Sequence, residues 1–147
     1  MSPKSHQSGS VLIIAIFVIV VMGMLGLTLI RLEWSNQDTL TREVLGTQAW
    51  FLAHSGNEWG LTYMYPLNES AAVSNLDTRC TSLDTDAVAA ASAIRQNADA
   101  PCSSLIIECE GSGSGDLRFY RISSVAVCGS TTFEVSREQE VWAKSME

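Results

Sequence analysis

The chain has 147 residues, with 16 acidic and 9 basic side chains and a formal net charge of −7. All of the acidic residues follow Ile30, so the C-terminal part of the chain carries the negative charge. A surface of this sign argues against binding to nucleic acid and against adhesion to anionic lipid. Residues 31–147 have the length of one small domain with a modest hydrophobic core.

An uncharged, mostly apolar run occupies residues 11–30. At about 1.5 Å per residue, a helix over this run is roughly 30 Å long, which matches the hydrocarbon core of a bilayer. The sequence after Ile30 offers no small-residue cleavage site of the kind that ends a secretory signal, and no cysteine follows closely enough to be lipidated. We therefore predict a retained transmembrane helix over residues 10–30. On hydropathy alone, an ordinary single-pass anchor explains the run equally well.

Residues 1–9 form a short polar leader that contains Lys4 and ends in Gly9, directly before the apolar run. This arrangement resembles the class III leader of type IV pilins and pseudopilins. The resemblance implies that prepilin peptidase cuts after Gly9 and methylates the new N-terminus at Ser10. In that family the segment after the cut is first a membrane anchor and then the assembly helix of the filament. The corresponding assembly residues here are Val11, Leu12, Ile13, Ile14, Gly23 and Gly26.

The chain departs from the family pattern at Ile14, because most pilins carry a glutamate at the fifth residue of the mature chain. A carboxylate inside the bilayer is costly, and the family tolerates it because it pairs with the N-terminal amine of the subunit added before. Ile14 cannot form that pair. A subunit at the tip has no predecessor, so Ile14 fits an initiating or minor subunit. A plain membrane anchor would equally have an apolar residue there.

Two further stretches, residues 25–31 and 48–61, resemble PilX-like minor pilins, and the likeness is strongest to the minor pilin of the mannose-sensitive haemagglutinin (MSHA) pilus. The resemblance covers about the first 65 residues. It implies a non-enzymatic subunit of the bacterial inner membrane with a periplasmic C-terminal domain, which enters the pilus and initiates or modulates its assembly. The implied partners are prepilin peptidase, the other minor pilins, the major pilin, the inner-membrane assembly platform and, before assembly, membrane lipid. The alternatives are a minor pseudopilin of type II secretion and a single-pass periplasmic protein without a filament role.

The four cysteines all follow the apolar run, and none forms a tight Cys-x-x-Cys pair; they are Cys80, Cys102, Cys109 and Cys128. An even number in a membrane-anchored outer domain predicts two disulfides in an oxidising compartment. The spacings do not form the paired knuckles of a structural zinc site. We therefore favour disulfides over a metal, place the C-terminal domain in the periplasm and expect no cofactor.

Strand geometry discriminates among the three possible disulfide pairings. If residues 105–110 and 117–128 form a tight hairpin, Cys109 lies opposite Arg118 and Cys128 is ten residues further along. At about 3.3 Å per residue that separation is too large for a disulfide, which needs Cα atoms within roughly 7 Å. Pairing of Cys102 with Cys128 and of Cys80 with Cys109 then becomes plausible. The pairing of Cys80 with Cys102 stays open if the hairpin does not form.

The pattern of residues predicts an α+β, pilin-like fold in which a long N-terminal helix packs on a small antiparallel sheet. No proline interrupts the chain from Ser10 until Pro66, and residues 31–65 continue the helix in amphipathic form. Gly23 and Gly26 are weak helix positions at which it could bend. One apolar stripe of that continuation is expected to pack on the sheet; it comprises Leu40, Val44, Leu45, Phe51, Leu52 and Trp59.

The remaining segments are predicted from composition and alternation. Residues 66–103 are rich in small polar side chains and indicate a variable loop region, with weak helical character only over residues 84–96. Residues 104–147 are expected to form the antiparallel sheet, with strands at 105–110, 117–128 and 131–142. Glycine and serine at 111–115 and 129–130 supply the turns.

Signals for catalysis are weak. His54 lies on the predicted helix beside Ser55, without the spacing of a nucleophile and base pair, and we interpret it as a helix-surface residue. Glu108 and Glu110 alternate along a strand, so both are expected to face solvent on one side. The Gly-Ser run at 111–115 precedes a strand and lacks a following lysine, which argues against a phosphate loop.

Overall fold

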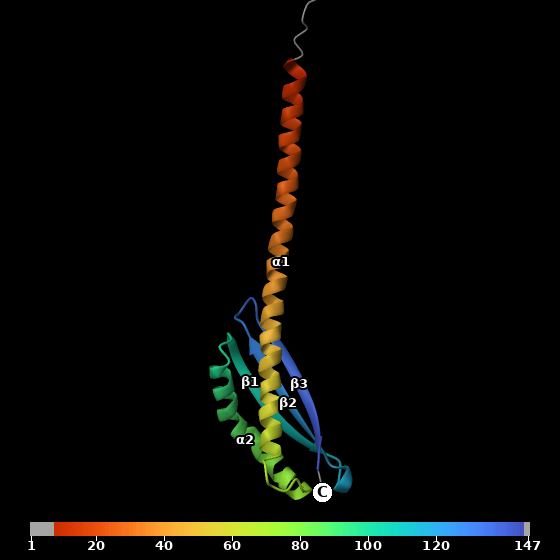
Figure 1. The fold of residues 1–147 in the computed structure, drawn as a ribbon, viewed down its shortest axis with the longest axis vertical. Coiled ribbons are helices and arrows are strands. Elements are labelled where there is room, and N and C mark those ends of the chain that lie inside the picture. Colours follow the sequence, from red (N-terminus) through yellow and green to blue (C-terminus); the bar gives the residue numbers. More distant parts are fainter. Residues whose placement is uncertain (1–7, 146–147) are drawn as a thin grey trace, which may run out of the picture. The chain divides into compact units, whose positions relative to one another are not determined.

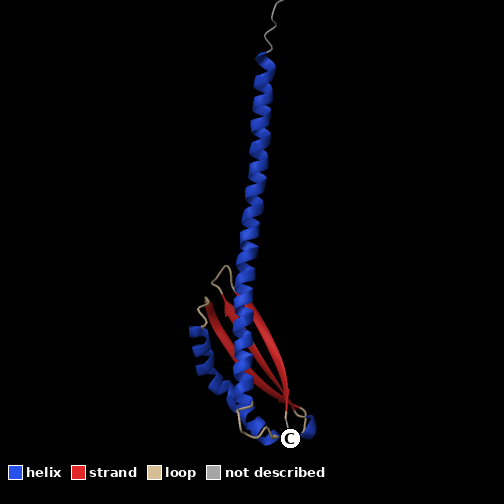
Figure 2. Cartoon of the chain, viewed as in Figure 1, coloured by secondary structure: helices blue, strands red, loops and turns tan. Residues whose placement is uncertain are grey.

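The computed structural model describes residues 8–145 and has the predicted α+β arrangement (Figures 1 and 2). The chain divides into two compact units, residues 1–40 and residues 41–147, and α1 contributes to both. A three-residue 3-10 turn, Gly115–Leu117, precedes the central strand. The main elements are α1 (Ser8–Met64), α2 (Val73–Asn97), β1 (Cys102–Ser112), β2 (Phe119–Cys128) and β3 (Val135–Lys144).

The first unit is the N-terminal part of α1. Within the described residues, this is the one helix that is long and apolar enough to cross a membrane. Helical structure continues without interruption through Gly23 and Gly26. Residues 1–7 of the predicted leader lie outside the described residues, and the backbone of Gly9 and Ser10 belongs to the first turn of α1.

In the second unit, one face of α1 packs on the sheet through small and aliphatic side chains. Ala49, Leu52 and Ala53 are buried there. The predicted apolar stripe is confirmed only in part: Leu45 and Leu52 are buried and Trp59 packs against the core. Leu40, Val44 and Phe51 are about half or more exposed. Successive residues on a helix point about 100° apart, so neighbouring side chains such as Val44 and Leu45 cannot both face the sheet.

The sheet has the order β1-β2-β3, and both neighbouring pairs are antiparallel. The predicted hairpin register is wrong, since Cys109 lies opposite Ile122 and not Arg118. The reason is that the ladder continues through Gly111 and Ser112, and the turn closes further along the chain than the glycine-rich run suggested. The side chains nevertheless alternate between a buried and an exposed face, as expected.

The largest correction concerns residues 66–103, which are not a loop region. Residues 73–97 form the helix α2, and only residues 65–72 and 98–101 connect it to its neighbours. Five of its side chains recur at spacings of three and four and are buried: Leu76, Cys80, Leu83, Ala87 and Ala91. Burial of this stripe outweighs the low helix propensity of the serine, threonine and aspartate residues between them.

Glycine is required where α1 crosses the central strand. A Cβ atom added at Gly56 would lie 2.8 Å from Oγ of Ser124 and 3.2 Å from Cγ1 of Ile107. Both neighbours belong to the sheet, and Ser124 is fully buried. The backbone of α1 therefore approaches the sheet more closely than any other residue type would permit.

We predict that Gly56→Ala destabilises the second unit by about 1–3 kcal/mol, because overpacking exceeds the gain in helix propensity. Gly46→Ala is the matched control, since its Cβ would meet only the mobile guanidinium end of Arg137, at 3.0 Å. The measurement is thermal unfolding of the detergent-solubilised chain, followed by near-ultraviolet circular dichroism. Equal midpoints for the two variants would contradict the close approach of α1 to the sheet.

Candidate functional site

The most extensive apolar surface of the molecule is the N-terminal part of α1. Val11, Leu12, Ile13 and Ile14 are all largely exposed in the isolated chain. The large hydrophobic side chains of residues 16–30 that are described are exposed as well. Because water does not tolerate a continuous apolar surface of this size, the segment requires lipid or other protein around it. Ile14 contributes no charge to this surface.

A second apolar surface lies on the part of α1 that faces away from the sheet. We call Trp50, Phe51 and His54 the α1 aromatic face. The ring of Trp50 stacks on His54 at a centroid distance of 5.3 Å and meets Phe51 edge-on at 5.0 Å. Phe51 remains 58% exposed. His54 is a helix-surface residue, as expected, and its Nε2 lies 3.6 Å from a carboxylate oxygen of Glu58.

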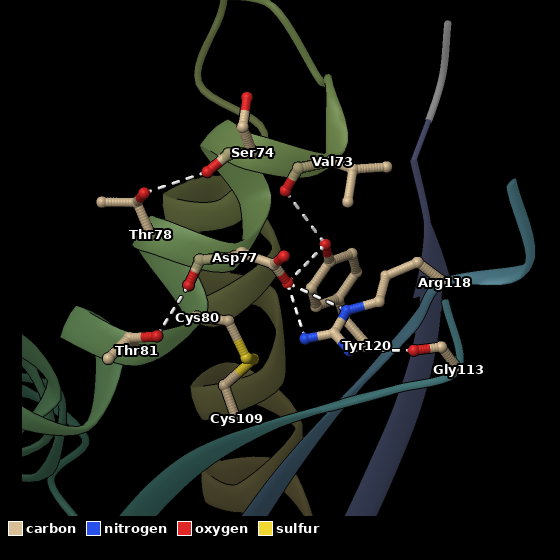
Figure 3. A network of polar contacts seen from close by, with 10 residues as sticks. All are labelled: Val73, Ser74, Asp77, Thr78, Cys80, Thr81, Cys109, Gly113, Arg118 and Tyr120. Carbon is tan, nitrogen blue, oxygen red and sulfur yellow. Dashed lines mark hydrogen bonds and ion pairs between the residues drawn. A yellow bond between two sulfur atoms is a disulfide. The ribbon is translucent and has the colours of Figure 1, made fainter. Parts of the chain in front are cut away.

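A polar cluster joins the start of α2 to the central strand (Figure 3). Oδ1 of Asp77 accepts hydrogen bonds from Nε of Arg118 at 2.9 Å and from the hydroxyl of Tyr120 at 3.0 Å. The carbonyl oxygen of Val73 lies 3.2 Å from the same hydroxyl. Burial, followed by the hydrogen bond with Asp77, raises the pKa of Tyr120 above its ordinary value. The cluster thus fastens α2 to β2 with a charge-assisted contact.

Two disulfides reinforce the same region. Cys80 of α2 is bonded to Cys109 of β1, and Cys102 is bonded to Cys128, its direct partner across the β1-β2 ladder. This is the pairing that the sequence left plausible; although the predicted register was wrong, Cys109 lies opposite Ile122 and is still far along the ladder from Cys128. Oδ1 of Asp84 also accepts a hydrogen bond from the backbone N–H of Cys109 at 3.0 Å. The helix α2 is therefore attached to β1 by a covalent bond and by a polar bond at the same residue.

The opposite side of α2 is attached to α1. The hydroxyl of Tyr63 donates a hydrogen bond to Asp86 and lies 2.9 Å from Oγ of Ser82. The hydrogen bond with Asp86 is the main cause of the raised pKa of Tyr63. No local sequence pattern indicates these polar contacts, because partners such as Asp77 and Arg118 are 41 residues apart.

We call residues 41–145 the head. Glu108 and Glu110 are both exposed, as predicted, and Glu110 pairs with Arg121 at 2.6 Å. Among the described residues, no group of three His, Cys, Asp or Glu side chains could hold a metal ion. The grooves beside α2 are open, and the groove next to β1 has a volume of about 400 Å³.

Comparisons with protein-family models, curated proteins and solved structures give no match to this chain. The features that bear on its function are the two apolar surfaces of α1 and the disulfide-bonded head.

We predict that alkaline pH weakens the head partly through Tyr120. Its contribution to stability is complete below pH 10.0, the ordinary tyrosine value, and declines above it, because the unfolded chain loses the phenolic proton first. Tyr120→Phe should lower the free energy of unfolding by about 1 kcal/mol at neutral pH and flatten its decline above pH 10. Urea unfolding between pH 7 and 11 measures both effects. An equally steep alkaline decline in the variant would contradict the role assigned to this hydroxyl.

Proposed function

We propose that the chain is a PilX-like minor pilin of an MSHA-type type IV pilus, processed by prepilin peptidase between Gly9 and Ser10. In this role it contributes to the initiation or modulation of pilus assembly, at or near the tip. Its mechanism is packing: residues 10–30 leave the bilayer and join the apolar helices of the filament, while the head presents a specific surface to neighbouring subunits.

The observation that carries this proposal is the composition of α1 along its length. The same helix begins with an exposed apolar segment directly after Gly9 and ends packed against a disulfide-bonded sheet. A plain anchor needs only the first of these features. An assembly helix needs both, because it must pass from lipid into contact with protein while it stays attached to a rigid head.

The absence of a charge at Ile14 supports a minor or initiating position. A buried carboxylate in a filament of apolar helices requires a partner, and Ile14 requires none. The first subunit of a filament has no earlier subunit whose N-terminal amine a carboxylate could neutralise. Ile14 therefore suits the one position at which the usual ion pair has no counterpart.

The α1 aromatic face supports contact with other subunits beyond the membrane segment. An exposed tryptophan and phenylalanine side by side are typical of interface cores rather than of solvated helix surfaces. The face lies outside residues 10–30, so lipid does not explain it. We assign it to packing against the helix of an adjacent subunit.

The first prediction of this proposal concerns processing. In cells with active prepilin peptidase, the mature chain should begin at a methylated Ser10, and in cells without it the leader should remain. Gly9→Leu should also leave the leader in place, because a bulky side chain occupies the position before the scissile bond. Intact mass and N-terminal sequencing of the membrane fraction measure this. An uncut Met1 terminus in both strains would favour a single-pass anchor without a filament role.

The second prediction concerns the α1 aromatic face. Phe51→Ser should reduce the amount of the chain that is recovered with sheared pili, relative to the amount in membranes, without lowering the thermal midpoint of the head. Leu67→Ser is the matched control, because Leu67 is 91% exposed and lies in the connection between α1 and α2. Equal recovery of both variants would remove this face from the filament contacts.

A further inference from the structure

The two edges of the sheet differ in how they are covered. At the β1 edge, Asp84 of α2 accepts a hydrogen bond from the outward-facing N–H of Cys109. The disulfide between Cys80 and Cys109 holds α2 in place there. At the other edge lies β3, and within residues 8–145 no further strand pairs with it. Figure 2 shows β3 at the rim of the sheet. Helix α2 covers the β1 edge, whereas at the β3 edge the carbonyls of Ser136 and Glu138 accept hydrogen bonds from the side chains of the neighbouring Arg137 and Gln139, which an added strand would displace.

The register identifies which backbone groups of β3 point outward. Because the N–H of Cys109 faces α2, Cys109 and Ile122 form a non-hydrogen-bonded pair, and Ile122 directs its backbone groups toward Val141. Alternation along the ladder then directs the N–H and C=O groups of the even-numbered residues of β3 away from the sheet. The carbonyl of Lys144 agrees with this assignment, since it accepts a hydrogen bond from the hydroxyl of Tyr65. The other outward-facing residues are Ser136, Glu138, Glu140 and Trp142.

The side chains of these residues lie on the face of the sheet opposite to α1, and all four are exposed. Glu140 shares the guanidinium of Arg121 with Glu110, so one cation serves two carboxylates. Glu138 has Val125 as its cross-strand neighbour. A strand added here therefore meets a net negative charge, from Glu138 and from the carboxylates of Glu140 and Glu110 that share Arg121, and an apolar ring at Trp142.

Pairing of β3 with β3 from a second copy of the chain is unfavourable. Antiparallel pairing about a two-fold axis through the middle of β3 places Glu138 against Glu138, Glu138 against Glu140, or Glu140 against Glu140. Like charges directly opposite each other on a sheet are destabilising. Glutamates on an exposed edge strand are a recognised means of preventing such self-association. The charge of this edge therefore disfavours pairing with a second copy of β3 and favours pairing with a basic strand.

We propose that the β3 edge binds an extended segment of another polypeptide, which adds to the sheet as an antiparallel strand. The segment carries basic residues opposite Glu138 and Glu140 and an apolar residue opposite Trp142. Backbone hydrogen bonds to the outward groups supply the affinity, and the alternate side chains supply the selectivity. This proposal stands independently of the filament role.

The test uses the full-length chain in neutral detergent micelles and a fluorescent peptide, Val-Thr-Lys-Thr-Lys-Thr-Thr, whose binding is followed by anisotropy. The lysines lie opposite Glu140 and Glu138 in the antiparallel register. A control peptide carries N-methyl groups on the two lysine amides, which keeps the charge but removes two ladder donors. We expect the N-methylated peptide to bind about tenfold or more weakly. A peptide with glutamate in place of lysine should not bind.

Variants of the chain separate backbone pairing from charge attraction. Glu140→Pro removes an outward N–H without disturbing the β2-β3 ladder, as proline on an edge strand allows. Glu140→Ala removes the same charge and keeps the N–H. We expect Glu140→Pro to weaken binding clearly more than Glu140→Ala, with both proteins folded by circular dichroism. Equal binding of the methylated and unmethylated peptides, equal loss in the two variants, or no binding of the lysine peptide would each overturn the proposal.

Discussion

The close approach of α1 to the central strand determines the arrangement of the head. Gly56 lies against Ser124, and a Cβ at Gly60 would be only 2.9 Å from Cγ2 of Ile122. Two glycines four residues apart therefore select one face of the helix for the sheet. The residues on the other side of α1, including Trp50 and Phe51, must then face outward. The surface that we assign to subunit contacts follows from the same packing that forms the core.

Helix α2 packs on the part of the sheet that α1 does not cover. The apolar stripe of α2 fills the remaining core, while Asp77, Asp84 and Asp86 each contact a different element. In the chain-entropy model, closing a loop of 29 residues with the Cys80–Cys109 disulfide stabilises the fold by about 3–4 kcal/mol. Such an attachment suits a small domain in an oxidising compartment, where the hydrophobic core alone supplies little excess stability.

The sequence predicted the features that depend on local patterns. The apolar run, the absence of proline between Ser10 and Pro66 and the alternation of buried residues in β2 indicated the long helix and the sheet. For α2 the sequence indicated only weak helical character over residues 84–96 and missed the rest, because serine, threonine and aspartate suggested a loop although Leu76 and Leu83 lie at helical spacing. The hairpin register was wrong because glycine at 111 was assigned to a turn. The cluster of Asp77, Arg118 and Tyr120 depends on tertiary packing, so no sequence pattern could have revealed it.

The head presents two surfaces that belong to different elements and have different chemistry. The α1 aromatic face is apolar and suits a helix, whereas the β3 edge is acidic and suits an extended basic strand. Helix α2 covers the β1 edge of the sheet. Among the described strands, only β3 then has an edge to which another strand can add. Since strand addition consumes backbone groups that α1 does not touch, one partner need not exclude the other. A chain with both surfaces can therefore contact a helical and an extended partner at the same time.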